Sequence, residues 1–232
     1  ARINRILNSV AWPSGDRMIG AGTVTVQATT LEGDALAELQ LTADTEIGEL
    51  YIDPGGRVFF RGRVASMTDT RSATSQATFG DDDGELDYHE LTISTDHEQV
   101  FNRTRITRVG GTEQTALDSV SVAEYFERTY QRTDLIMDSD AQALTYAQYV
   151  LALASVPHLR FDSVAILPTA DPTTLFPQVL GRRFGDRITI RRRPPGGGDP
   201  IERDVWIRGV RHEITDQSWR TTWTLQAAVD ID

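Results

Sequence analysis

Residues 185–228 read GDRITIRRRPPGGGDPIERDVWIRGVRHEITDQSWRTTWTLQAA, and they decide the fold. Ile188 and Ile190 alternate with polar neighbours, and Val205, Ile207 and Val210 lie in a second run. Trp219, Thr221, Trp223 and Leu225 follow with a spacing of two. A period of two is typical of β-strands. The connecting segment PPGGGDP, residues 194–200, is neither strand nor helix, because proline removes an amide donor and glycine adds backbone freedom. The chain is therefore predicted to end in a β-meander that completes a barrel or a sandwich.

A small α+β unit is expected over residues 1–66. The sequence predicts, in order, a helix over residues 2–11, a strand over 23–29, a helix capped by Asp34, and a hairpin of 49–53 with 57–61. Leu36, Leu39 and Ala43 are expected to share the buried face of the second helix. The hairpin turns through DPGG, residues 53–56, where Pro and Gly suit the two central turn positions.

A β-barrel or sandwich with one packed helix is expected over residues 88–232, after a linker or loop at 67–87 that is rich in Thr, Ser and Asp. Its predicted strands are 88–94, 100–109, 112–117 and 161–167, together with the terminal meander. Ser139 and Gln142 have the spacing of a capping box and open a helix over 140–154. Because Val150–Ala154 is apolar on all sides, this helix is expected to be buried against the sheet. The predicted fold class is α+β, mainly β.

Composition excludes several classes of protein. The formal net charge is −11 and every one of the 23 basic residues is arginine, so sequence-specific nucleic-acid binding is not expected. The chain has no cysteine, which excludes disulfides and thiolate metal sites. No apolar run reaches the roughly 18 residues of a membrane span, so membrane insertion is not expected. The sequence starts at Ala1 without a Met, and its being part of a longer polypeptide stays open.

Three blocks of the sequence carry a family resemblance. They are Leu31–Leu36 with Leu50–Val58, Gly84–Tyr88 with Thr92–Asp96 and Phe101–Arg103, and Leu180–Ile190 with Trp206–Ile214 and Trp219–Leu225. In their order and spacing these blocks resemble the tail-hub proteins (tail-tip or baseplate hub proteins, often called minor tail proteins) of long-tailed bacteriophages. The resemblance covers nearly the whole chain.

The resemblance implies a structural virion protein without enzymatic activity or cofactor. Hub proteins form a homotrimer around the tail axis at the distal end of the tail tube, and their barrels look like the tail-tube subunit. The implied partners are the tail tube or distal tail protein, the tape measure protein, and tip or fibre proteins. The implied location is the tail tip of the virion, after assembly in the host cytoplasm. An acidic chain also suits a DNA conduit, since a basic lumen would retain phosphates.

An arginine-rich tract is the candidate partner interface. Its candidate residues are Arg182, Arg183, Arg187, Arg191 and Arg193. The last three share one face of a strand. We expect this face to meet an acid-rich surface of a neighbouring subunit, either residues 32–53 or residues 81–98. Pairing with acids of the same subunit is the alternative.

No metal or catalytic residue is assigned. Residues 79–90 align with an EF-hand loop through Gly84, but Phe79 would occupy the first ligand position and has no oxygen to offer. We therefore expect no requirement for calcium. Neither His97 nor His212 begins the zinc-protease motif, and the sequence has no G-x-S-x-G elbow. His212 is expected to close a strand and to bond a neighbouring backbone group.

Two other functions stay open. A carbohydrate- or receptor-binding β-module of a tail tip would use Trp206, Trp219 and Trp223 as its platform, although core packing is the commoner use of large aromatics. A tail-associated cell-wall hydrolase would need two carboxylates that face each other across a cleft. The sequence gives no means of choosing such a pair.

Overall fold

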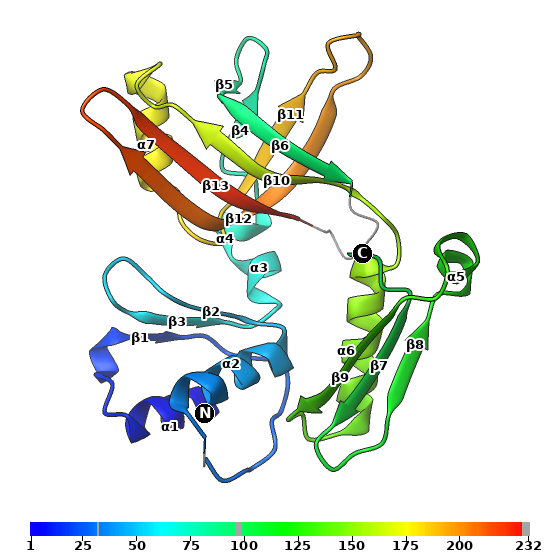
Figure 1. Cartoon of the computed structure of the whole chain (residues 1–232). Coiled ribbons are helices and arrows are strands. Elements are labelled where there is room, and N and C mark those ends of the chain that lie inside the picture. Colours follow the sequence, from blue (N-terminus) through cyan, green and yellow to red (C-terminus); the bar gives the residue numbers. More distant parts are fainter. Residues whose placement is uncertain (32, 96–98, 229–232) are drawn as a thin grey trace. The chain divides into compact units, whose positions relative to one another are not determined.

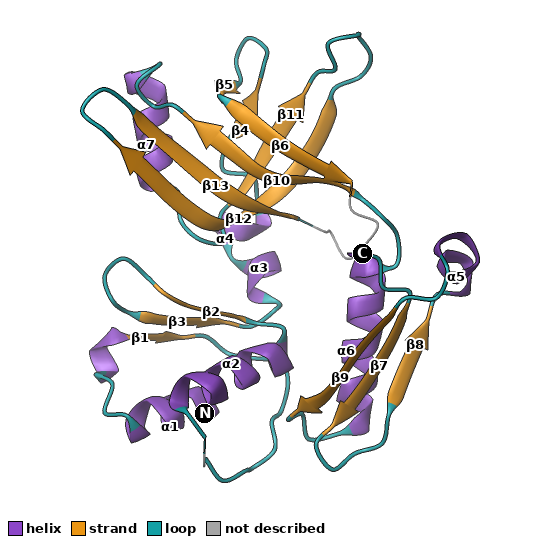
Figure 2. Cartoon of the chain, viewed as in Figure 1, coloured by secondary structure: helices purple, strands orange, loops and turns teal. Residues whose placement is uncertain are grey.

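The computed structural model describes residues 1–31, 33–95 and 99–228 (Figures 1 and 2). Two compact units divide the chain: the first comprises Ala1–Met67 and Glu98–Pro157, and the second Thr68–His97 and His158–Asp232. Strands account for 35% of the chain and helices for 28%, so the predicted α+β, mainly β class is confirmed. No helix in the described ranges is long and apolar enough to cross a bilayer.

The N-terminal part of the first unit packs two helices on a small sheet. Its elements are α1 (Arg2–Ser9), η1 (Ser14–Asp16), β1 (Arg17–Ile19), α2 (Ala35–Glu46), β2 (Glu49–Ile52), β3 (Val58–Arg61) and α3 (Ala65–Thr68). The sheet order is β1-β3-β2, with β1 parallel and β2 antiparallel to β3. Ile3, Ile6 and Leu7 on one face of α1 are buried against α2 and β3, which confirms the amphipathic pattern.

The second part of the first unit is a three-stranded sheet with one helix against it. Its elements are β7 (Arg103–Arg108), β8 (Gln114–Leu117), α5 (Ser119–Tyr125), β9 (Thr129–Leu135) and α6 (Asp140–Ala154), with sheet order β8-β7-β9. Ser139 accepts a hydrogen bond from the Gln142 amide, so the predicted cap of α6 is confirmed. The buried face of α6 is Ala143, Tyr146 and Ala147, whereas Val150–Ala154 is half-buried and Ala152 is exposed. The helix thus packs against a sheet as expected, but its apolar stretch is less buried than its composition indicated.

The prediction of a strand over residues 23–29 is also wrong. Within the described residues this segment makes an isolated bridge between Val26 and Met137. The buried Glu46 carboxylate accepts hydrogen bonds from the amides of Thr23 and Val24, at 2.8 and 2.7 Å. A side chain thus satisfies donors that a strand would have given to a neighbouring strand.

The second unit is built on a seven-stranded sheet. Its elements are α4 (Thr70–Ala73), β4 (Thr78–Gly80), β5 (Leu86–Asp87), β6 (Glu90–Thr95), β10 (Leu159–Ile166), α7 (Pro172–Gly181), β11 (Arg187–Arg192), β12 (Ile201–Ile214) and β13 (Trp219–Ala227). The strand order is β5-β4-β11-β12-β13-β10-β6. β11, β12 and β13 pair antiparallel in sequence order, so the predicted meander is confirmed. The sheet is not a closed barrel, although its two edge strands, β5 and β6, are separated in sequence by Tyr88 and His89 alone.

The prediction of one barrel over residues 88–232 with helix 140–154 packed on it is wrong. α6 packs on the sheet of β7, β8 and β9 in the first unit, and α7 contributes Leu175 and Val179 to the core of the second unit. The predicted linker over 67–87 contains α4, β4 and β5, and the last two are strands of the large sheet. Periodicity indicates which face of an element is apolar, but it does not indicate which sheet that face covers.

Candidate interaction surfaces

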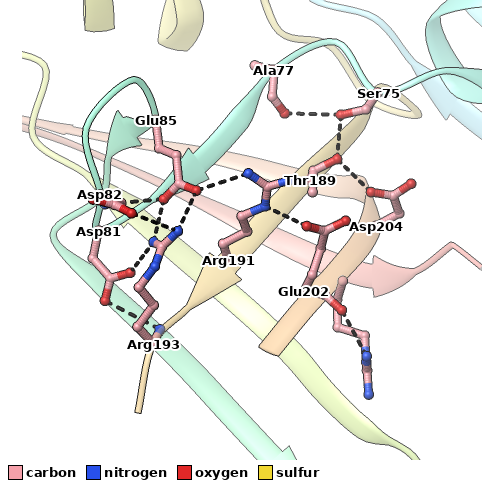
Figure 3. A network of polar contacts seen from close by, with 11 residues as sticks. Ser75, Ala77, Asp81, Asp82, Glu85, Thr189, Arg191, Arg193, Glu202 and Asp204 are labelled. Atoms are coloured by element: carbon pink, nitrogen blue, oxygen red, sulfur yellow. Dashed lines mark hydrogen bonds and ion pairs between the residues drawn. The ribbon is translucent and has the colours of Figure 1, made fainter. Parts of the chain in front are cut away.

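The arginine tract at the end of β11 pairs with the acidic loop between β4 and β5 of the same chain. Figure 3 shows the Glu85 carboxylate between the guanidinium groups of Arg191 and Arg193. Arg193 donates to both Glu85 oxygens at 2.7 and 3.0 Å and to Asp81 at 2.9 Å, while Arg191 donates to Glu85 at 3.1 Å and also to Glu202. The acids expected to meet a neighbour's arginines therefore meet those of their own subunit.

Glu85 is the centre of this cluster. Its side chain is 6% exposed, so its charge depends on its partners rather than on water. The hydrogen bonds from Arg193, and then those from Arg191, lower the pKa of this carboxyl from its ordinary value of 4.5 to about 2. The cluster ties the loop between β4 and β5 to the end of β11.

The other members of the tract also have contacts within the second unit. Arg187 donates to Asp204 at 2.6 Å, across the β11–β12 pair. Arg182 donates to the side chain of Gln178 and to the carbonyl of Gln76. The side chain of Arg183 is exposed, so this is the candidate residue most open to a partner. An interface role for the five arginines stays a prediction.

The acidic loop between β4 and β5 is a tight turn whose carboxylates pair with arginines of the same chain. Gly84 has φ +87°, as a tight turn requires. Phe79, at the first position of the EF-hand alignment, is fully buried and packs edge-on against Trp223 with ring centroids 5.4 Å apart. Among the described residues no group of three or more His, Asp or Glu side chains could hold a metal ion. His97 and Glu98 lie outside the described residues, as does Glu32 of the other acid-rich segment.

The tryptophans do not form a common platform. Trp206 is 8% exposed and donates to the Ser72 carbonyl at 2.9 Å, and Trp223 is fully buried. Trp219 packs edge-on against Phe176 of α7. Because two of the three side chains are buried, they do not form the carbohydrate-binding platform that the sequence left open. His212 contacts the Thr221 hydroxyl at 2.9 Å rather than a backbone group, because β12 and β13 place these two residues opposite each other.

An apolar groove in the first unit was not foreseen. It has a volume of about 530 Å³ and lies between α1, α2 and β2. The lining includes Leu7, Trp12, Leu36, Leu39, Ile52 and Val58. Leu36 is 57% exposed at its rim, whereas Leu39 and Ala43 are buried, so the expected common face of α2 is only partly correct. In the described part of the chain the Trp12 indole Nε1 is shielded from solvent and has no hydrogen-bond partner.

The fold has relatives among solved structures, whereas no protein-family model and no curated protein matches the sequence. A tail protein from Neisseria meningitidis has a TM-score of 0.63 at 12% identity, over 96% of this chain and 64% of that chain. A 43 kDa tail protein of a Shewanella oneidensis prophage has a TM-score of 0.58 at 13% identity, over 97% of this chain and 65% of that chain. The chain shares the fold of these two tail proteins.

The likeness includes both units, because it covers nearly all of the present chain. The chain spans 64% and 65% of the length of the two tail proteins. At such low sequence identity the likeness establishes the fold, and a fold alone does not establish a function.

Proposed function

We propose that this chain is a structural protein of a bacteriophage tail and, more specifically, a subunit of the tail hub at the distal end of the tail tube. The observation that carries the proposal is the shared fold with two tail proteins over 96% and 97% of the chain. The sequence blocks that resemble tail-hub proteins support it independently, because they were identified from the residues alone.

As a hub subunit the chain forms a homotrimer around the tail axis. Its neighbours are the tail tube or distal tail protein, the tape measure protein, and tip or fibre proteins. Its role is geometric rather than catalytic: it shapes the tail tip and surrounds the DNA path. The net charge of −11 suits this role, since acidic walls do not retain phosphates.

Antibody labelling of purified tails tests the position of the protein. Gold-labelled antibody against this chain is expected at the distal tip of the tails made by the phage or prophage that encodes it. Tails from a deletion of the gene are the control. Label along the tube or at its head-proximal end would contradict the hub position, and tails without label would contradict a tail role.

A native mass measurement tests the trimer. We expect a trimer that high salt weakens without abolishing, because exposed ion pairs contribute roughly 0–1 kcal/mol each while apolar contacts persist in salt. A monomer at high protein concentration and low salt would count against the ring.

A further inference from the structure

The turn between β4 and β5 contains the only Asp-Gly step of the chain, Asp83–Gly84. When glycine follows aspartate, the glycine nitrogen can attack the carboxyl carbon of the aspartate side chain, because glycine has no Cβ to obstruct the approach. The resulting ring opens to aspartate or to isoaspartate. In a folded protein this reaction depends on the exposure of the two residues and on the hydrogen bonds that hold them.

Asp83 and Gly84 occupy the two central positions of a β-turn. The Glu85 amide donates to the Asp82 carbonyl at 3.1 Å and closes the turn. The φ of +87° at Gly84 is that of the third residue of a type II turn, whose own amide takes no part in the closing hydrogen bond. Within the described residues no acceptor binds the Gly84 amide. Its nitrogen is therefore available to the Asp83 side chain.

The Asp83 side chain is the free carboxylate of this turn. Glu85 is bound by two arginines, and Asp82 forms an ion pair with Arg193 at 3.3 Å. No group in the described part of the chain bonds to the Asp83 carboxylate, and both Asp83 and Gly84 are exposed. The side chain can therefore rotate towards the Gly84 nitrogen, and solvent supplies the water that opens the ring.

Two comparable steps elsewhere in the chain are protected by the fold. Asn8–Ser9 ends the helix α1, and the side-chain oxygen of Asn8 accepts from Arg17 at 2.6 Å. In Asp118–Ser119 the carboxylate of Asp118 caps α5 by accepting from two backbone amides. These hydrogen bonds fix the side chains in positions that the reaction would have to break. Asp83–Gly84 has no such protection.

We propose that Asp83–Gly84 is a site of spontaneous isoaspartate formation. The Gly84 nitrogen bonds to Cγ of the protonated Asp83 carboxyl, and its proton leaves with the carboxyl hydroxyl as one water molecule. The five-membered imide then takes up one water. Addition at Cγ restores aspartate, whereas addition at the backbone carbonyl breaks the original peptide bond and leaves the chain running through Cγ. No oxidant or reductant is needed, and the inference does not depend on the proposed function.

The modification changes the geometry of the turn. It lengthens the backbone by one carbon atom between Asp82 and Glu85, whose hydrogen bond closes the turn. The Glu85 carboxylate lies 2.7 Å from Arg193 and 3.1 Å from Arg191, so a displaced turn weakens these contacts. The site thus couples a slow covalent change to the contact between this turn and β11.

Incubation of the folded protein at moderately elevated temperature, followed by peptide mapping, tests the site. Isoaspartate is quantified by enzymatic methylation with an isoaspartyl methyltransferase and located by fragmentation mass spectrometry, and the imide is lighter by one water. We expect isoaspartate to accumulate at Asp83 and not at Asp118. None at Asp83, under conditions that modify a synthetic peptide of residues 77–90, would overturn the proposal. An equal amount at Asp118 would also overturn it.

Asp83→Glu is the matched control. It keeps the charge, but its side chain is too long for a five-membered ring, so methylation should stay at the level of the unincubated protein. Because Asp83 is exposed, the variant should start with the wild-type melting temperature. Incubation should lower the melting temperature of the wild type and leave that of the variant unchanged. Methylation that persists in the variant would overturn the site, and an equal fall in both would overturn its link to stability.

Discussion

The backbone of Phe126, directly after α5, has φ 62° and ψ 164°, in a region that is essentially reserved for glycine. An L-residue in this region of backbone space costs about 1–3 kcal/mol, and glycine avoids that cost. We therefore expect Phe126→Gly to be more stable than Phe126→Ala by about 1 kcal/mol, which reverses the usual order of the two residues. Thermal unfolding should show a melting temperature a few degrees higher for the glycine variant.

The matched control is Val120, which is also exposed but lies inside α5. There alanine should be more stable than glycine by about 1 kcal/mol, as in any helix. If alanine is the more stable residue at both positions, Phe126 is not strained.

Glu85 is the residue whose ionisation should matter most for stability in acid. Its folded pKa of about 2 lies below its ordinary value of 4.5, so it stabilises the fold above about pH 4.5 and loses that contribution as the pH falls towards 2. Glu85→Gln should cost about 2 kcal/mol at pH 7 and flatten the melting temperature between pH 4.5 and 2. Glu202→Gln is the control, because the Glu202 side chain is 51% exposed. Equal pH profiles for the wild type and Glu85→Gln would contradict this role.

At single positions the sequence predicted which side chains are buried better than it predicted which residues form ion pairs. Ile188 and Ile190 are fully buried, as their alternation indicated. The partners of Arg191 and Arg193 followed from a parallel pairing of β4 with β11, which joins residues more than a hundred positions apart. Nothing in the local pattern encodes that pairing. The groove between α1, α2 and β2 was missed for a similar reason, since it is assembled from segments that are separated in sequence.

At the scale of elements, caps and regular spacing were the reliable signals. The helices α1, α2 and α6 were predicted, and Asp34 and Ser139 cap α2 and α6 as expected. The helix α7 was missed although Asp171 and Pro172 form a good start signal. The strand β9 was missed because its sequence TYQRTDL is mostly polar. Its position beside β7 comes from tertiary pairing rather than from an apolar period.

The pairing of β11 with the acidic loop changes the expected effect of charge reversal. Arg191→Glu with Arg193→Glu would place two carboxylates beside Glu85 and Asp81, so the melting temperature of the second unit should fall. Thermal melting is the measurement. Arg203→Glu on the exposed face of β12 is the control and should change stability by less than about 0.5 kcal/mol. An unchanged melting temperature with a lower assembled mass would instead support contact between subunits.

At the scale of the whole molecule, the chain leaves the second unit after β6 and returns to it at β10. Residues 98–157 belong to the first unit, yet β6 and β10 are neighbouring antiparallel strands. The strands over 88–117 were predicted to share a sheet with the meander because the two groups lie on either side of the helix over 140–154 in the sequence. Strands that follow one another along the chain usually share a sheet. An excursion into another unit between two paired strands breaks that rule. No change in composition marks either crossing.

The register of β6 and β10 leads to a test of this organisation. Thr95 lies opposite Leu159, so the two strands can be joined directly by an Asn-Gly turn that replaces residues 96–158. A chain of residues 68–228 with this replacement should keep all seven strands of the large sheet, because every one lies in the retained segments. It should unfold cooperatively and show the blue-shifted tryptophan fluorescence of buried Trp206 and Trp223. Residues 159–228 alone are the control: they lack β4, β5 and β6, and with β4 the buried Phe79 that packs on Trp223, so no cooperative transition is expected. If the shortened chain shows no cooperative unfolding transition, like this control, then the second unit needs the inserted residues 96–158 in order to fold.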